Sequence, residues 1–347
     1  MMSGAEAHAG RQGSARSWTK VLATYRQPDQ IRSLFEIIVT VLPFIAFWAT
    51  AAVCVAHGSL WGLCFTVPAA GFLVRLFILQ HDCGHGALFM RRGLNDWIGR
   101  LLGVFTLTPY DYWRRSHAVH HASVGNLDRR GIGDVDTLTV AEYRALSPWA
   151  RARYRLYRHP LVMFGLGPAW LFVCQYRVPL GFMRAGAQPW ISTLSTNLAI
   201  ALPIAVLIWL IGFVPFLMVQ VPITLMAATA GVWLFYVQHQ FEETHWTEQE
   251  DWDFQKSALH GSSHYDLPRP LRWLSGNIGI HHVHHLAARI PFYRLPEVLR
   301  DYPELKQVGR ITFLESFKCV RLVLWDEGDK CLISFRAERS ARGALPA

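Results

Sequence analysis

The sequence predicts an all-α integral membrane protein with four transmembrane helices in two hairpins and a helical cap outside the membrane. Composition is the first reason. Of the 347 residues, 52% are hydrophobic and only 17% are charged, whereas soluble domains contain about 25% charged residues. The mean hydropathy is +0.18. The second reason is that the chain contains two long runs without Asp, Glu, Lys or Arg. These features exclude a disordered chain, a coiled coil and a disulfide scaffold.

Each uncharged run is long enough for two crossings. The first, Ile37–Val74, has 38 residues, and the second is densest over Leu198–Val237, with 40 residues. One crossing takes about 20 apolar residues. We expect residues 57–59 to form the turn of the first hairpin and Phe213–Val221, with Pro215, to form the turn of the second. The alternative, buried helices of a large soluble protein, is disfavoured because soluble cores rarely contain two such runs.

Two shorter apolar segments are not expected to span. Residues 94–105 place apolar side chains at helical spacing, which predicts an amphipathic helix at the membrane surface. Leu161–Tyr176 has only 16 residues and is broken by Gly165, Gly167 and Pro168. If it crossed the bilayer, the histidine clusters described below would lie on opposite sides of the membrane.

The runs divide the chain into five predicted parts. The segment between the hairpins is rich in arginine from Arg91 to Arg158, as cytoplasmic segments of membrane proteins are, and the basic N-terminus has no cleavable signal pattern. The predicted parts are a cytoplasmic N-terminal segment (1–34), transmembrane hairpin 1 (35–80), a cytoplasmic region with interfacial helices (81–195), transmembrane hairpin 2 (196–238) and a cytoplasmic cap with the C-terminal tail (239–347).

Half of the 16 histidines fall into three clusters with helical spacing. His81 and His85 form HxxxH, whereas residues 117–121 and 281–285 each form HxxHH. Positions i, i+3 and i+4 share one face of a helix, so each cluster directs two or three imidazoles to one place. His282 is offset from the shared face and is expected to point away, and His264 is expected at the surface or behind the ligands.

The number and type of these side chains indicate a metal centre. Imidazole suits zinc, copper, iron and nickel, and a closed site takes about four ligands, so eight or nine histidines are enough for two ions. An all-nitrogen site at a membrane surface favours two irons that activate O₂. Zinc lacks redox chemistry, whereas ligand type leaves copper open.

At these clusters the sequence resembles the membrane-bound fatty acid desaturase family, in particular its bacterial acyl-lipid, omega-6 (delta-12) branch. Three histidine boxes with these spacings are the signature of the family, and the resemblance covers roughly residues 33–332. Sequences beside the boxes are also similar: NLDRRG at 126–131, VQHQFE at 237–242, GNIGI at 276–280 and RIPFYRLP at 289–296.

The resemblance implies a non-haem di-iron enzyme with four transmembrane helices and both termini in the cytoplasm. It also implies that the box histidines bind iron, that a histidine after the last crossing completes the site, and that Asn277 makes a water-mediated contact. The implied metal ligands are His81, His85, His117, His120, His121, His239, His281, His284 and His285.

The implied reaction is the O₂-dependent introduction of a cis double bond into a lipid acyl chain, with two Fe ions (Fe²⁺/Fe³⁺) as cofactor and O₂ as co-substrate. No amino-acid side chain supplies the oxidant that an unactivated CH₂ group requires. Acidic residues near the boxes are candidates for hydrogen bonds to the outer imidazole nitrogens: Asp82, Asp111, Asp128, Glu242 and Asp266.

Electrons are expected from a separate protein. The sequence has no dinucleotide-binding fingerprint, no Cys₄ iron–sulfur pattern and no cytochrome b5 haem motif. A small acidic, ferredoxin-like donor suits the net charge of +9, and nothing in the sequence points to nucleic acid. The substrate is expected to be an acyl chain of a membrane lipid, and the location to be a bacterial inner membrane with the active site facing the cytoplasm.

Two alternatives stay open at this point. A related di-iron hydroxylase or carotenoid-modifying oxygenase could share the same boxes, although the sequences beside the boxes favour desaturation. A histidine-rich metal transporter is the remote alternative. It would require ionisable residues inside the spans, and both long runs lack charged residues.

Overall fold

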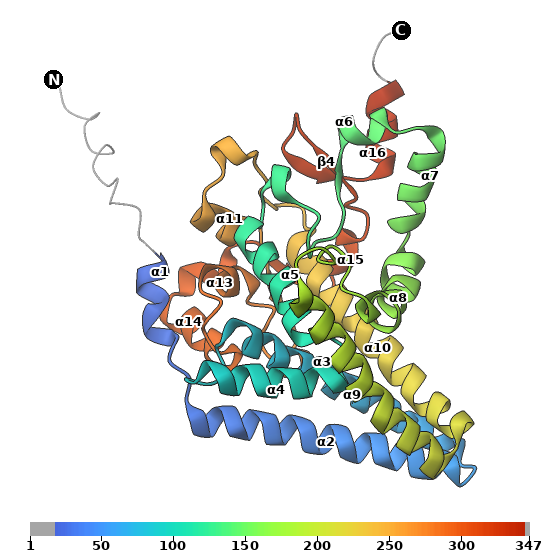
Figure 1. Ribbon diagram of the computed structural model, residues 1–347. Helices are drawn as coiled ribbons and strands as arrows, with labels where there is room; N and C mark the ends of the chain where they lie inside the picture. The colour runs from blue at the N-terminus through green and yellow to red at the C-terminus, as the bar shows by residue number, and fades with distance from the viewer. Residues whose placement is uncertain (1–17, 344–347) are drawn as a thin grey trace, which may run out of the picture.

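The computed structural model describes residues 18–343 and consists of two long helical hairpins with a cap of short elements at one end (Figure 1). Residues 1–17 of the predicted N-terminal segment lie outside the described residues. Within the described part, four helical segments are long and apolar enough to cross a membrane, which confirms the predicted fold class. They are Gln30–Ala56, Leu60–His85, Ala187–Ile211 and Phe213–His239.

The first hairpin pairs α2 (Gln30–Ala56) with α3 (Thr66–His85), which a 3₁₀ turn at Leu60–Phe65 precedes. The Asp29 carboxylate starts α2 by accepting hydrogen bonds from the Ile31 and Arg32 amides, at 2.9 and 3.1 Å. Gly58, at φ +82°, turns the chain between the two helices, within the predicted 57–59.

The second hairpin turns at a different residue from the predicted one. α9 (Ala187–Ile211) and α10 (Phe213–His239) are separated by Gly212 alone, so the predicted turn at Phe213–Val221 is wrong. Gly212 adopts φ +87°, a conformation that glycine enters without steric cost. Pro215 lies in the first turn of α10, where a missing amide hydrogen breaks no intrahelical bond.

The outer surfaces of these helices are apolar. Leu202, on α9, is 61% exposed and Trp209 is 82% exposed, and soluble monomers rarely expose such continuous apolar surface. α9 begins nine residues before the predicted start at residue 196, because the polar side chains of its first turns, including Ser192 and Thr193, are buried rather than solvated. The N-terminal turns of α9 thus extend beyond its apolar part, toward the cap.

Helices α4 (Arg92–Phe105) and α5 (Tyr110–Ser123) follow the first hairpin, and α4 packs against α3 and α9. A Cβ atom at Gly99 would lie 2.2 Å from the Tyr110 ring, so the close contact of α4 with α5 requires glycine there. The predicted interfacial stretch 161–176 forms a π-helix and a short α-helix. Between α5 and α9 the chain also forms α6 (Val140–Ala145), α7 (Pro148–Tyr157), the π-helix η4 (Val162–Leu166), α8 (Gly167–Val173) and two 3₁₀ turns, η3 (Leu127–Arg129) and η5 (Gln175–Arg177).

The cap contains short strands as well as helices, so it is less purely helical than predicted. Parallel β1 (Leu138–Thr139) and antiparallel β5 (Cys331–Ile333) both pair with β4 (Leu324–Asp326), and β2 (His264–Asp266) pairs in parallel with β3 (Arg310–Thr312). The short helix before α2 is α1 (Trp18–Val21), and the cap helices are α11 (Phe254–His260), α12 (Arg269–Leu274), α13 (His281–Leu286), α14 (Leu295–Asp301), α15 (Ser316–Cys319) and α16 (Phe335–Gly343).

A buried arginine joins the first hairpin to the cap. Arg75 on α3 pairs with the Glu36 carboxylate on α2 and donates to the Trp273 carbonyl at the end of α12. Its guanidinium also lies 4.1 Å from the centre of the Trp273 ring. Arg75 and Glu36 are each 1% exposed, and these buried contacts fix α12 of the cap to the first hairpin.

Candidate metal centre

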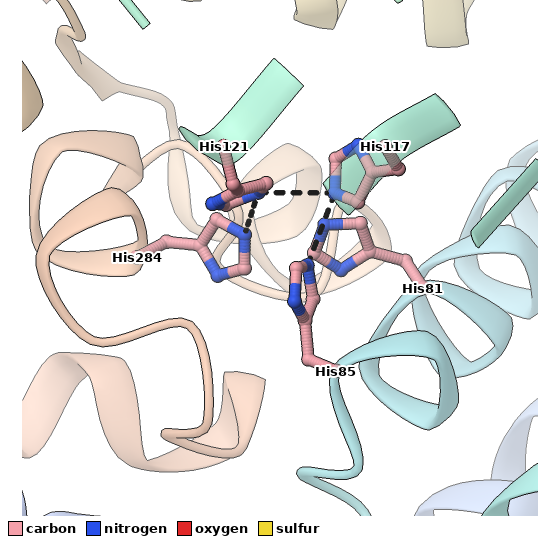
Figure 2. A group of neighbouring side chains, drawn as sticks. All are labelled: His81, His85, His117, His121 and His284. Atoms are coloured by element: carbon pink, nitrogen blue, oxygen red, sulfur yellow. Dashed lines mark hydrogen bonds between the residues drawn. The ribbon is translucent and has the colours of Figure 1, made fainter. Parts of the chain in front are cut away.

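Five histidines from three helices converge at the cap end of the first hairpin (Figure 2). His81 and His85 occupy the last two turns of α3, His117 and His121 lie four residues apart on α5, and His284 comes from α13. One nitrogen from each ring lies within 4.8 Å of all the others. We call these five side chains the first histidine group.

Four further histidines form a second group beside the first. His120 comes from α5, His239 is the last residue of α10, and His281 and His285 come from α13. Their ligand nitrogens also lie within 4.8 Å of one another. The His121 and His285 rings, one from each group, stack with centroids 4.1 Å apart. The two groups therefore adjoin.

Helical periodicity explains how one helix serves both groups. On α5, His117 and His121 are one turn apart and face the first group, whereas the neighbouring His120 is rotated toward the second. On α13, His281 and His285 face the second group and His284 faces the first. All nine histidines that the sequence selected are thus brought together, five in one group and four in the other. The expectation that each HxxHH box directs its three imidazoles to one place is wrong, because both boxes are divided between the two groups.

The distances between nitrogens fit metal coordination. His117 Nε2 lies 3.0 Å from His85 Nε2 and 3.1 Å from His121 Nε2. In the second group, His281 Nε2 lies 3.0 Å from His239 Nε2 and 3.1 Å from His285 Nε2. Adjacent ligands about 2.1 Å from one ion in octahedral geometry lie about 3.0 Å apart. Moreover, His120 Nε2 is buried without a hydrogen-bond partner. The donor set fits two ions that accept imidazole.

The environment keeps the imidazoles neutral. Burial lowers the pKa values of five of these histidines well below the ordinary value of about 6.5, and the neighbouring imidazoles lower them further. The five are His117, His121, His281, His284 and His285. A neutral imidazole has an unshared electron pair on one ring nitrogen, which a metal ion requires. The site therefore presents ligating nitrogens at neutral pH.

Three of the histidines are oriented through their outer nitrogen. His239 Nδ1 donates to the Gly261 carbonyl at 3.2 Å, and His81 Nδ1 lies 3.3 Å from Asp82 Oδ1. His120 Nδ1 bonds the Asp134 carboxylate. Since these oxygens accept a proton-bearing Nδ1, the Nε2 atoms are left free to face the groups.

The acidic residues selected from the sequence have different surroundings. Asp82 contacts His81, and its other oxygen accepts from the Phe292 amide at 2.7 Å. Asp111 pairs with Arg100, and Asp266 pairs with Arg310. Asp128 accepts a hydrogen bond from the backbone amide of Gln249, and Glu242 is exposed.

The carboxylate of Asp134 bonds a histidine, and this contact was not predicted from the sequence. Asp134 follows Gly131 and Gly133, which adopt φ +105° and +77° and turn the loop back toward α5. A Cβ atom at Gly133 would lie 3.3 Å from His120 Cβ, so the loop is pressed against the helix. Two glycines just before an aspartate were the signal available in the sequence.

Residues outside the two groups have structural contacts. Asn277 adopts φ +55°, and its side-chain amide donates to the Phe292 carbonyl at 3.3 Å. His282 points away and donates to the Leu305 carbonyl at 2.9 Å. His264, at 6% exposed, is buried beside His282 and bonds the Lys306 carbonyl at 2.7 Å.

Comparisons with known proteins agree with this geometry. The family model for fatty acid desaturases matches residues 59–312. The chain is 43% identical to the fatty acid desaturase of Bacillus subtilis over 330 residues, 94% of this chain and 93% of that protein. It is 30% identical over 285 residues to the sn-1 acyl-lipid omega-3 desaturase (ferredoxin) of Synechocystis, 78% and 74% of the two chains. It is 27% identical over 237 residues to the sn-1 oleoyl-lipid 12-desaturase of Synechocystis, 64% and 63% of the two chains. These matches confirm the family predicted from the histidine boxes. The chain belongs to the fatty acid desaturase family of oxidoreductases.

Proposed function

We propose that the chain is a di-iron acyl-lipid desaturase whose nine histidines hold two iron ions, five nitrogens around one and four around the other. The observation that carries the proposal is the pair of adjoining histidine groups at the ends of α3 and α10. Iron fits the proposal better than zinc because desaturation is an oxidation and zinc has no redox chemistry. Two irons would supply the oxidising chemistry with O₂.

The protein's own side chains would position the acyl chain and exclude water. Trp113 stacks on the His117 ring, with centroids 4.7 Å apart. Phe235 lies 5.1 Å from the ring centres of both His120 and His239. Apolar walls beside the site suit a hydrocarbon chain and keep the reacting carbons dry. The net reaction takes two hydrogens from adjacent CH₂ groups and reduces O₂ to two waters with two electrons and two protons.

The proposed substrate is an acyl chain of a membrane lipid, and the proposed product carries an omega-6 (delta-12) cis double bond. Support comes from the sequences beside the boxes and from similarity to an sn-1 oleoyl-lipid 12-desaturase. The proposed electron donor is a separate ferredoxin-like protein, since one relative is named as ferredoxin-dependent and the net charge of this chain is +9. In this proposal the active site and both termini face the cytoplasm of a bacterial inner membrane.

Expression in a host that makes oleoyl lipids but no dienes tests the proposal. The lipids are hydrolysed and the fatty acids identified by mass spectrometry, with and without O₂. A diene that is absent without O₂ and absent with His117→Ala supports it. A hydroxy fatty acid as main product would refute desaturation in favour of hydroxylation, and a new monoene from saturated chains would refute the double-bond position alone.

A further inference from the structure

An open cleft of about 410 Å³ lies where α3, α4, α5 and α9 meet. Three arginines line it: Arg92 at the start of α4, and Arg114 and Arg115 on α5. Gly84 and Pro189 form part of its wall. We call this feature the arginine cleft. None of its lining residues belongs to the two histidine groups.

The arginine cleft lies at the boundary between the spanning helices and the cap. Gly84 is in the last turn of α3 and Pro189 is in the first turn of α9, so both mark the cap ends of spanning segments. Large apolar side chains on two of the helices that form it are exposed, with Trp97 on α4 at 71% and Ile191 on α9 at 64%. Tryptophan beside arginine is typical of the headgroup level of a bilayer.

The cleft and its nearest ion pairs carry excess positive charge. The cluster consists of four guanidinium groups and two carboxylates: those of Arg92, Arg100, Arg114, Arg115, Asp96 and Asp111. Asp96 binds Arg92 and Arg114, at 3.2 and 2.8 Å, and Asp111 binds Arg100 at 2.8 Å and lies 3.6 Å from Arg114. Because these two acids already bridge arginines, the four guanidiniums and two carboxylates leave a net charge of +2.

Arg115 differs from the other arginines of this cluster in its ion pairing. Among the described residues, no carboxylate lies within ion-pairing distance of it. Its guanidinium instead lies 5.0 Å from the centre of the Phe182 ring, and the residue is exposed. A guanidinium presents several N–H donors in one plane, a geometry that matches phosphate oxygens. Arg115 can therefore bind an anion without first giving up a carboxylate partner.

The arginine cleft is one layer of side chains away from the first histidine group. Gly84 precedes His85, and Arg114 lies one helical turn before His117. Trp113 fills the space between them, stacked on His117. A Cβ atom at Gly84 would lie 2.9 Å from the Trp113 ring, so glycine is required for this close packing. A ligand anchored in the cleft would hold an attached acyl chain beside the metal centre.

We infer that the arginine cleft binds the anionic phosphate of a glycerophospholipid, as the headgroup end of the substrate. This inference rests on the proposed acyl-lipid function and names the class of lipid. The cleft has the charge for a phosphate, lies at the cap ends of spanning segments, where headgroups are expected, and is formed by helices that also carry exposed apolar side chains, which suit acyl chains. A protein partner would meet these apolar side chains within the lipid, which argues against an acidic protein as the occupant.

Lipid binding by the iron-loaded protein, measured by native mass spectrometry from detergent micelles, tests the inference. The probes are phosphatidylglycerol and diacylglycerol with identical acyl chains. Arg115→Gln is expected to weaken phosphatidylglycerol binding about five-fold, and Arg115→Glu about twenty-five-fold, from the usual effect of one basic side chain near anionic lipid. Diacylglycerol binding should not change. Arg153→Gln, at an exposed position on α7, is the matched control and should bind both lipids as the wild type does.

Several results would overturn the inference. Unchanged phosphatidylglycerol affinity in both Arg115 variants would do so, as would an equal loss for diacylglycerol. Displacement of the lipid by equimolar inorganic phosphate would assign the cleft to free phosphate. Weaker binding of a reduced ferredoxin with unchanged lipid binding would assign it to the electron donor. Because the assay needs neither O₂ nor electrons, a selective loss in a protein that oxidises no acyl chain would refute the proposed function and leave the lipid site standing.

Discussion

On the proposed assignment of one iron to each histidine group, replacing Asp134 with asparagine should weaken iron binding in the second group while the first group keeps its iron. The Asp134 carboxylate bonds His120 Nδ1, and His120 is 1% exposed, so water cannot readily replace the lost partner. Removing such a partner costs 10- to 100-fold in metal affinity, or about 1.4 to 2.7 kcal/mol. Asparagine still offers a neutral oxygen, and a neutral hydrogen bond is about half as strong as a charged one. We therefore expect about a ten-fold loss for Asp134→Asn and about a hundred-fold loss for Asp134→Ala.

A chelator titration measures this effect directly. The purified protein is dialysed against increasing chelator concentrations, and iron is determined per chain at each step. The wild type should lose its two irons within a narrow range, whereas the Asp134 variants should lose one iron at a lower chelator concentration. Asp128→Asn is the matched control, since Asp128 lies in the same loop and accepts from the Gln249 amide rather than from a histidine.

Two outcomes would refute this reasoning. If Asp134→Ala retained both irons at wild-type affinity, the carboxylate would have no part in orienting His120. If Asp128→Asn released iron as readily as Asp134→Ala, the effect would belong to the loop as a whole rather than to the hydrogen bond between Asp134 and His120.

Three further predictions concern stability, pH and orientation. Arg158, 3% exposed, donates to the Tyr236 hydroxyl and the Leu322 carbonyl among others. Arg158→Met should lower the free energy of unfolding by about 3 kcal/mol or more, while Arg153→Met stays within about 0.5 kcal/mol, as thermal unfolding will show. Burial lowers the pKa of His282 in the folded protein to about 3. Below pH 6.5 the unfolded chain therefore binds more protons at this histidine than the folded protein does. The metal-free protein should therefore be most stable above pH 6.5 and lose about 1.4 kcal/mol per pH unit from this histidine as the pH falls toward 3; a midpoint that rose between pH 7 and pH 5.5 would contradict this. Reporter fusions after Arg130 and after Leu286 should both read cytoplasmic, and opposite readings would exclude a single metal centre.

Local patterns in the sequence were sufficient for the four spans and for the choice of the eight box histidines, whereas His239 lies in no such cluster and was included only through the family resemblance. Length and hydropathy along two uncharged runs predict four spans, because the bilayer sets both requirements. The i, i+3 and i+4 spacing of the boxes is a property of one helix turn, so the side chains of each cluster could be selected without tertiary information. The turn at Gly212 escaped prediction because proline within an apolar run is also compatible with the first turn of a helix.

Which histidines from different helices share a group depends on tertiary structure. His121 and His284 lie 163 positions apart in the sequence, yet their Nε2 atoms are 3.2 Å apart, and no local pattern links them. The same holds for Asp134, whose loop conformation directs it to His120. The arginine cleft is built from four helices. The amino-acid sequence by itself thus determined the spans and the spacing of the box histidines, because both are short-range properties. Partners and distances were decided by packing, because they join segments that only the folded chain brings together.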